Sequence, residues 1–291
     1  MGLFNFDFLQ GPELGPDAPR RKNIFLYTEI FFRKFFKLMK SNLLYFLVSL
    51  PIVLIVYFFA PIEYFVKNII PANLFDAGLI NSAIPQIRLL TTALFMLFFG
   101  SGPASAGYAY ILRCFTRENH VWLWTEFWEK FRENIKQGLV TLIVALVCVP
   151  MMLTAIFVYF KLAQTASLPM YSVLLYILAV LFIMVILMHT FIYQIMITYD
   201  CNIRMLYKNS FLMVLAKFPI TLINLSLGTL ITVLIFTWLH PLAAVVLYIL
   251  FGYGFSRFPS EFYSARVIER MIKDSEPEKQ EDDDEEEALY E

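Results

Sequence analysis

The chain has 291 residues, of which 59% are hydrophobic and only 16% are charged. A soluble globular protein has roughly 45–50% apolar and about 25% charged residues, so this composition excludes a soluble domain and indicates an integral membrane protein. The net charge of −1 hides a separation of charge, because the segment from Asp274 onward has eleven acidic residues and one Lys (−10), which leaves +9 on residues 1–273. We expect the basic part to contact the anionic lipid bilayer. Nucleic acid is excluded as a partner, since the basic residues adjoin apolar segments and form no separate basic domain.

Six apolar segments reach or approach the roughly 20 residues that a membrane-crossing helix needs. They are residues 42–60, 87–112, 138–160, 171–199, 218–239 and 241–256. The last segment is short and contains Gly252 and Gly254. If it did not cross, the chain would have five spans and a C-terminus outside the cell.

Basic residues are distributed unevenly between these segments. Seven precede the first span, five follow the second, three follow the fourth and four follow the sixth, beginning with Arg257. The alternate connections hold only Lys67, Arg88 (where the second span begins) and Lys161. Because cytoplasmic loops carry the excess of Lys and Arg, this pattern predicts six spans in the cell membrane with both termini in the cytoplasm.

The composition divides the chain into three parts. Residues 1–23 contain GPELGPDAP and predict an irregular arm, residues 24–273 form the six-span helical membrane domain, and residues 274–291 predict a disordered acidic tail. The tail is either a solvated extension or a contact for a basic partner that also limits binding of anionic lipid.

Amphipathic stretches precede the first and third spans and predict helices that lie in the inner membrane interface. Before the first span, apolar residues from Tyr27 to Met39 recur at helical spacing, with basic residues elsewhere on the helix. Before the third span, an aromatic stripe and a following lysine form a candidate partner-binding surface within 115–137: Trp124, Phe127, Trp128, Phe131 and Lys136.

The two amphipathic stretches also align with each other. Residues 34–50 match residues 130–146 at a constant offset, and a looser third copy runs through 208–225. The domain is then an all-α membrane bundle built from three helical-hairpin repeats, which commonly place a ligand site at their interface. The alternative is that Lys-rich aromatic stretches recur before any span.

A Gly-Pro-Ala segment interrupts the second span. Pro103 removes a backbone donor, and the small residues around it (Gly102, Ala104 and Ser105) let another backbone approach. The segment either serves tight helix packing or forms a broken helix whose carbonyl groups bind a polar ligand.

His189, Gln194 and Asn224 are polar residues within predicted spans and are further candidate ligand contacts. His189 is either a neutral histidine bonded to a neighbouring helix or part of a proton relay. The relay interpretation is weakened because the sequence predicts no second acid or base within a span.

Two motifs resemble a known family. They lie in SGPASAGYAYILRCFTRENHVWLWTEFWEKFRENIKQG (residues 101–138). The first motif consists of Gly102, Pro103, Ala104, Ser105 and Ala106, and the second of Phe127, Phe131, Asn134, Lys136 and Gln137. Together they resemble the YesL-like family of bacterial integral membrane proteins, a domain of unknown function, over roughly residues 25–260.

The family has no settled biochemical activity. Its genes often stand beside oligosaccharide importers and polysaccharide-degrading enzymes of Gram-positive bacteria. The resemblance therefore implies an accessory or transport component of carbohydrate uptake, with a carbohydrate transporter subunit as partner. The alternative is a structural or lipid-interacting protein that transports nothing.

Enzyme motifs are missing from the sequence: it contains no HExxH, no Gly-x-Ser-x-Gly and no phosphate-binding Gly-rich loop. The three cysteines have no CxxC spacing. We therefore expect no catalysis, no cofactor and no metal. The oligomeric state is left open by the sequence.

Overall fold

The computed structural model describes residues 29–60, 77–117, 119–165 and 168–270. The predicted arm 1–23, the acidic tail 274–291 and Tyr27 lie outside these ranges. All regular elements in the described part are helical, which confirms the all-α class. They are α2 (Phe35–Phe59), α4 (Ala77–Phe99), α5 (Pro103–Thr116), α6 (Leu123–Glu133), α7 (Ile135–Thr165), α8 (Pro169–Met196), α9 (Ile203–Trp238), α10 (Pro241–Leu247) and the π-helical η2 (Tyr248–Gly252).

The number of helices long and apolar enough to cross a membrane confirms a multi-pass membrane protein. Five described helices qualify alone, and a sixth crossing results if α4 and α5, bent by 67° at their junction, form one broken span. The cytoplasmic placement of the termini stays a prediction.

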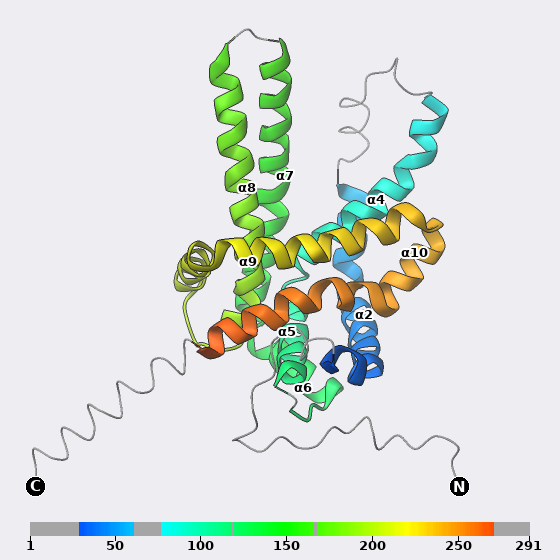
Figure 1. Cartoon of the computed structure of the whole chain (residues 1–291), viewed down its shortest axis with the longest axis vertical. Coiled ribbons are helices and arrows are strands. Elements are labelled where there is room, and N and C mark those ends of the chain that lie inside the picture. Colours follow the sequence, from blue (N-terminus) through cyan, green and yellow to red (C-terminus); the bar gives the residue numbers. More distant parts are fainter. Residues whose placement is uncertain (1–28, 61–76, 118, 166–167, 271–291) are drawn as a thin grey trace, which may run out of the picture.

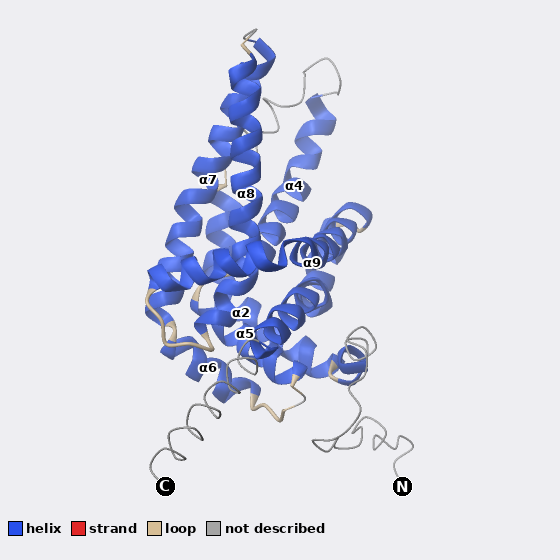
Figure 2. Cartoon of the chain, turned by 60° about the vertical axis from the view of Figure 1, so that its left-hand side comes forward, coloured by secondary structure: helices blue, strands red, loops and turns tan. Residues whose placement is uncertain are grey.

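The helices do not stand as a simple parallel bundle. The helices α7 and α8 form a long antiparallel hairpin, and both Figure 1 and Figure 2 show α9 crossing this hairpin at a steep angle. The helix that follows α9 returns beside it (Figure 1). The two backbones are in close contact at Gly228, because a Cβ added to this residue would lie 2.2 Å from the backbone oxygen of Ser256. The helix α9 packs directly on α8, α4 contacts both of these helices, and α2 packs against α4, α5 and the π-helical turn η2.

The break between α4 and α5 follows from four residues, Gly-Ser-Gly-Pro. Gly100 has a φ of 72°, and its N–H donates to the oxygen of Met96 at 3.1 Å, which ends α4. Gly102 has a φ of 68° and precedes Pro103, which opens α5 at a position where its missing N–H costs nothing. The sequence therefore encodes a stop and a start, and the span predicted over 87–112 consists of two helices, α4 and α5, broken at the Gly-Pro-Ala segment.

The short predicted span 241–256 is wrong in its C-terminal limit. The helix runs over Pro241–Arg270, which we call the C-terminal helix, and it passes Gly252 through the π-helical turn η2. Arg257, counted above among the basic residues that follow the spans, is instead buried inside the protein. With 30 residues, this helix is long and apolar enough to cross a membrane although it contains Gly252 and Gly254.

The predicted boundaries of the amphipathic stretches also differ from the structure. Residues 29–33 are helical, but after a turn at Lys34 the spanning helix α2 has already begun at Phe35. The third repeat copy, 208–225, lies within α9 and includes the non-helical backbone at Lys217. The amphipathic stretch before the third span forms a separate helix, α6, of 11 residues.

We predict that Gly102→Ala destabilises the protein. A Cβ at this position would lie 2.7 Å from the backbone oxygen of Gly138, and the positive φ costs an L-residue about 1–3 kcal/mol. The thermal unfolding temperature in detergent should fall clearly. Gly252→Ala is the control, because its Cβ would meet only the side chains of Ile235 and Tyr248. Equal losses in both variants would contradict this account.

Candidate functional site

Two oppositely charged side chains lie buried in the middle of the protein. Arg257 and Glu261 are one turn apart on the C-terminal helix, and the Arg257 Nε donates a hydrogen bond of 2.8 Å to the Glu261 Oε1. Their side chains are 3% and 2% exposed. Burying such a pair costs several kcal/mol per ion, so further hydrogen bonds must stabilise both groups.

The end of α4 supplies partners for Arg257. Three side chains donate hydrogen bonds to carbonyl oxygens in the last turn of α4: Arg257 to Leu97, Tyr193 to Phe99 (2.6 Å) and Tyr253 to Met96 (3.4 Å). The last carbonyls of a helix lack partners within it, and they carry the negative end of the helix dipole. The cation is therefore placed where the break leaves uncompensated negative charge.

Gln194 of α8 connects the same pair to α5. Its Nε2 donates to the Glu261 Oε2 at 2.6 Å and to the backbone oxygen of Ala109 at 3.3 Å. The other side-chain atom, Oε1, is buried without a partner. The guanidinium of Arg257 also lies 5.9 Å from the centre of the Tyr193 ring. The pair thus contacts α4 and α8 besides its own helix, and Gln194 links it to α5.

His189 lies on α8, close to this group. Its Nδ1 is 2.9 Å from the backbone oxygen of Val185, and since a carbonyl only accepts, Nδ1 carries the proton. The Nε2 is buried without a partner, and the ring packs edge-on against Phe99 at 4.9 Å. The histidine is bonded to its own helix and not to a neighbouring one. The expectation that no other acid or base lies within a span was wrong, because Arg257 and Glu261 do.

Buried tyrosines close the space between α2, α5 and the C-terminal helix. Tyr45 stacks on Tyr253 with ring centres 4.7 Å apart, and Tyr108 packs against both at 4.9 and 5.4 Å. Asn42 accepts a hydrogen bond from the Tyr108 hydroxyl and donates to the oxygen of Leu250 at 3.2 Å. The π-helical turn that contains Leu250 is thereby tied to α2.

The predicted Gly-Pro-Ala-Ser segment lies at the centre of these contacts. Gly102, Pro103, Ala104 and Ser105 are all buried at the start of α5. The Ser105 Oγ accepts from the N–H of Ser101 at 2.7 Å and lies 3.2 Å from the Tyr45 hydroxyl oxygen. The polar groups of the break are therefore occupied by other parts of the chain.

Asn224 is not part of this group. It lies half-buried on α9, and its Nδ2 donates at 3.0 Å to the oxygen of Ile220 in its own helix. Of the polar candidates, the structure brings Ser105, His189 and Gln194 to the helix break and places Asn224 elsewhere.

The predicted partner-binding stripe is divided between buried and exposed positions. Phe127 is fully buried against α5, where a Cβ on Gly107 would lie 2.8 Å from the Phe127 backbone oxygen. Trp128 and Phe131 are partly buried beside it, with ring centres 5.1 Å apart. Trp124 is 63% exposed and Lys136 is also exposed. Only the ends of the predicted surface remain accessible.

Sequence reasoning missed Arg257 and Glu261 because it ended the last span at residue 256. The sequence contains a signal for this pair. Residues 255–268 are rich in small and aromatic residues, and Arg257 and Glu261 are spaced by four. This pattern is typical of a buried helix whose two charges compensate each other.

The chemistry open to this arrangement is limited by its hydrogen bonds. The carboxylate of Glu261 receives donors on both oxygens, and the guanidinium of Arg257 contacts both a carboxylate and a carbonyl. Within the described residues, no group of three or more His, Cys, Asp or Glu side chains is placed to hold a metal ion. The site is best suited to fixing helix positions.

Comparison with known proteins locates the similarity in the first part of this site. Residues 87–156 match the model of a family described as "Protein of unknown function, DUF624". This segment covers most of α4, all of α5 and α6 and part of α7, so it includes the helix break but not Arg257 or Glu261. No curated protein and no solved structure matches the chain.

We predict that Arg257→Met and Glu261→Met each destabilise the protein by about 3–5 kcal/mol, because each leaves one buried charge without its partner. The double variant should lose clearly less than the sum, as measured by unfolding in a double-mutant cycle.

The matched control is the Arg117–Glu269 pair, whose Nε–Oε1 distance is 2.6 Å but whose side chains are 39% and 18% exposed. Its coupling should stay below about 1 kcal/mol. Additive losses at residues 257 and 261 would show that the two charges do not stabilise each other.

Proposed function

We propose that this chain is a non-enzymatic accessory component of the membrane that conducts no polar substrate through its own helices. One observation carries the proposal: in the last turn of α4, at the break, the carbonyl oxygens of Leu97 and Phe99 accept hydrogen bonds from Arg257 and Tyr193. Tyr253 adds a second donor to the oxygen of Met96, which also accepts from the Gly100 N–H.

In transporters, broken helices bind substrates and ions because their unwound backbone and helix ends line a cavity. Here a ligand at the break would have to displace three side chains of the same protein. It would also have to replace the hydrogen bond of a buried guanidinium. Removing one partner of a buried ion pair is costly, so occupancy of the break by protein favours a structural role for it.

The resemblance to the YesL-like family suggests which assembly this component joins. Proteins of that family are implied to work beside carbohydrate importers, and the matched segment 87–156 includes α6. The exposed aromatic residues Trp122 (70%) and Trp124 (63%) on and beside α6 fit such a contact, since Trp is enriched at protein interfaces. A carbohydrate transporter subunit is therefore the proposed partner of α6.

The second candidate is a structural or lipid-interacting protein without a transported substrate or partner. The observation that favours it is a largely apolar groove between α4, α8 and α9. The same tryptophans would then lie among lipid headgroups, where amphipathic rings are also enriched.

We predict that a cysteine at the helix break does not react with a water-soluble thiol reagent. Ser101→Cys would be made in a variant that lacks Cys114, Cys148 and Cys201, and labelled in membrane vesicles opened to both sides. Ser101 is buried and its Oγ lies 2.6 Å from that of Ser49, so no water should reach it. The control is Asn119→Cys, which is exposed between α5 and α6 and should react readily.

Rapid reaction at residue 101 would show a water-filled path to the break and would contradict the proposal. Burial raises the pKa of the Cys201 thiol, so this native cysteine reacts slowly at neutral pH. It must be removed because its slow reaction would be mistaken for slow reaction at residue 101.

A photo-reactive amino acid in place of Trp124 should crosslink to a carbohydrate transporter subunit in intact cells, as identified by mass spectrometry. The control is the same amino acid at Glu133, which is half exposed on the same helix but points about 180° away at 100° per residue. Adducts to lipid alone at residue 124 would overturn the partner and favour the second candidate.

A further inference from the structure

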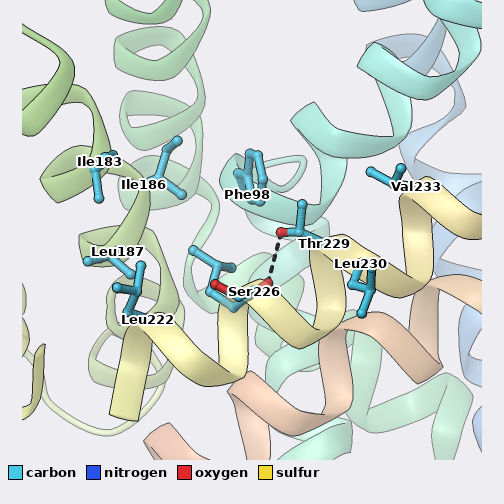
Figure 3. A pocket seen from close by; sticks show the side chains of 10 residues that line it. Phe98, Ile183, Ile186, Leu187, Leu222, Ser226, Thr229, Leu230 and Val233 are labelled. Atoms are coloured by element: carbon cyan, nitrogen blue, oxygen red, sulfur yellow. Dashed lines mark hydrogen bonds between the residues drawn. The ribbon is translucent and has the colours of Figure 1, made fainter. Parts of the chain in front are cut away.

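We propose that the groove between α4, α8 and α9 binds one acyl chain of a membrane lipid. The groove has a volume of about 400 Å³, and eight of its ten lining residues are apolar. Leu187 of α8 and Leu225 of α9 are buried at its base. Figure 3 shows side chains of α8 and α9 facing each other across the groove, with Phe98 of α4 between them.

The polar content of the groove is too small for a sugar or an ion. Its polar residues are Ser226 and Thr229. The Thr229 hydroxyl already donates to the oxygen of Leu225 at 2.8 Å, the bond drawn in Figure 3. A polar solute would lose its hydration without gaining equivalent hydrogen bonds, which costs several kcal/mol. The lining therefore selects a hydrocarbon.

A transmembrane helix is a poorer occupant than an acyl chain. Helices associate in membranes through small residues that allow close backbone contact. On α9 the glycine, Gly228, and Thr232 face the C-terminal helix at Ser256, with the Thr232 hydroxyl 3.0 Å from that of Ser256. The face that lines the groove has no glycine, and beside Ser226 and Thr229 it carries four large apolar residues: Leu222, Leu225, Leu230 and Val233.

The groove is continuous with the surface that contacts the bilayer. Both α8 and α9 are candidate membrane spans, and the rim residues Ile183, Leu222 and Leu230 are exposed, as is Val180 one turn before Ile183. A lipid chain can therefore enter sideways from the membrane. It gains dispersion contacts on several sides that a chain on a convex helix surface does not have. This site includes neither Arg257 nor Glu261 and no residue of α6.

The test uses the full chain in nanodiscs that contain a phospholipid with a photo-reactive group in its acyl chain. Labelled residues are mapped by mass spectrometry. We compare labelling of the groove with labelling of Val180 and Leu181, which are exposed on α8. The groove should be labelled at least about fourfold more, which is the ratio that burial of one additional methylene group gives. Uniform labelling would overturn the proposal, and this readout needs no variant.

A bulky side chain in the groove should then remove the enrichment. Ser226→Trp places an indole among the lining residues, and we expect labelling of the groove to fall to the level of the surrounding surface. Ile223→Trp is the control, because Ile223 is 66% exposed on the same helix and does not line the groove. Unchanged labelling in the folded Ser226→Trp variant would overturn the assignment to lipid. A covalent dimer formed through a Ser226→Cys variant would also overturn it, because a second copy of the chain would then cover the groove.

Discussion

A backbone carbonyl inside a bilayer must find its hydrogen-bond partner within the protein, and this constraint shapes the whole structure. The chain breaks its second crossing at Gly100–Pro103, which leaves the last carbonyls of α4 without partners in their helix. Arg257 and Tyr193 supply donors to Leu97 and Phe99, and Tyr253 adds a second donor to Met96, which also accepts from the Gly100 N–H. The positions of α8 and the C-terminal helix follow from this requirement, because each must bring its donor to the same turn.

The buried charge of Arg257 then requires its own compensation. Glu261 provides it from the next turn of the same helix, and Gln194 completes the hydrogen bonds of the carboxylate. Intramembrane charges often mark substrate or proton pathways. In this protein, Arg257 and Glu261 bind other groups of the protein, and the network joins helices. In a transporter, such charges bind water or substrate.

Two surfaces of the described residues differ in chemistry. The exposed tryptophans of α6 combine an apolar ring with a polar N–H and lie next to charged residues, which suits a partner or the headgroup layer. The groove along α8 and α9 offers mainly hydrocarbon. Both surfaces offer exposed side chains for binding.

The sequence alone determined the membrane class, the all-helical fold and the approximate positions of the candidate spans, because hydrophobic length is a local property. It also located the Gly-Pro-Ala segment, since glycine and proline act on their own backbone. It could not locate the buried pair: Arg257 lies beside an interface in the linear pattern and was assigned to it. Only the tertiary structure shows that the last helix continues to Arg270 and that its charges meet the carbonyls of α4. Such a contact joins residues 160 positions apart, and no local pattern records it.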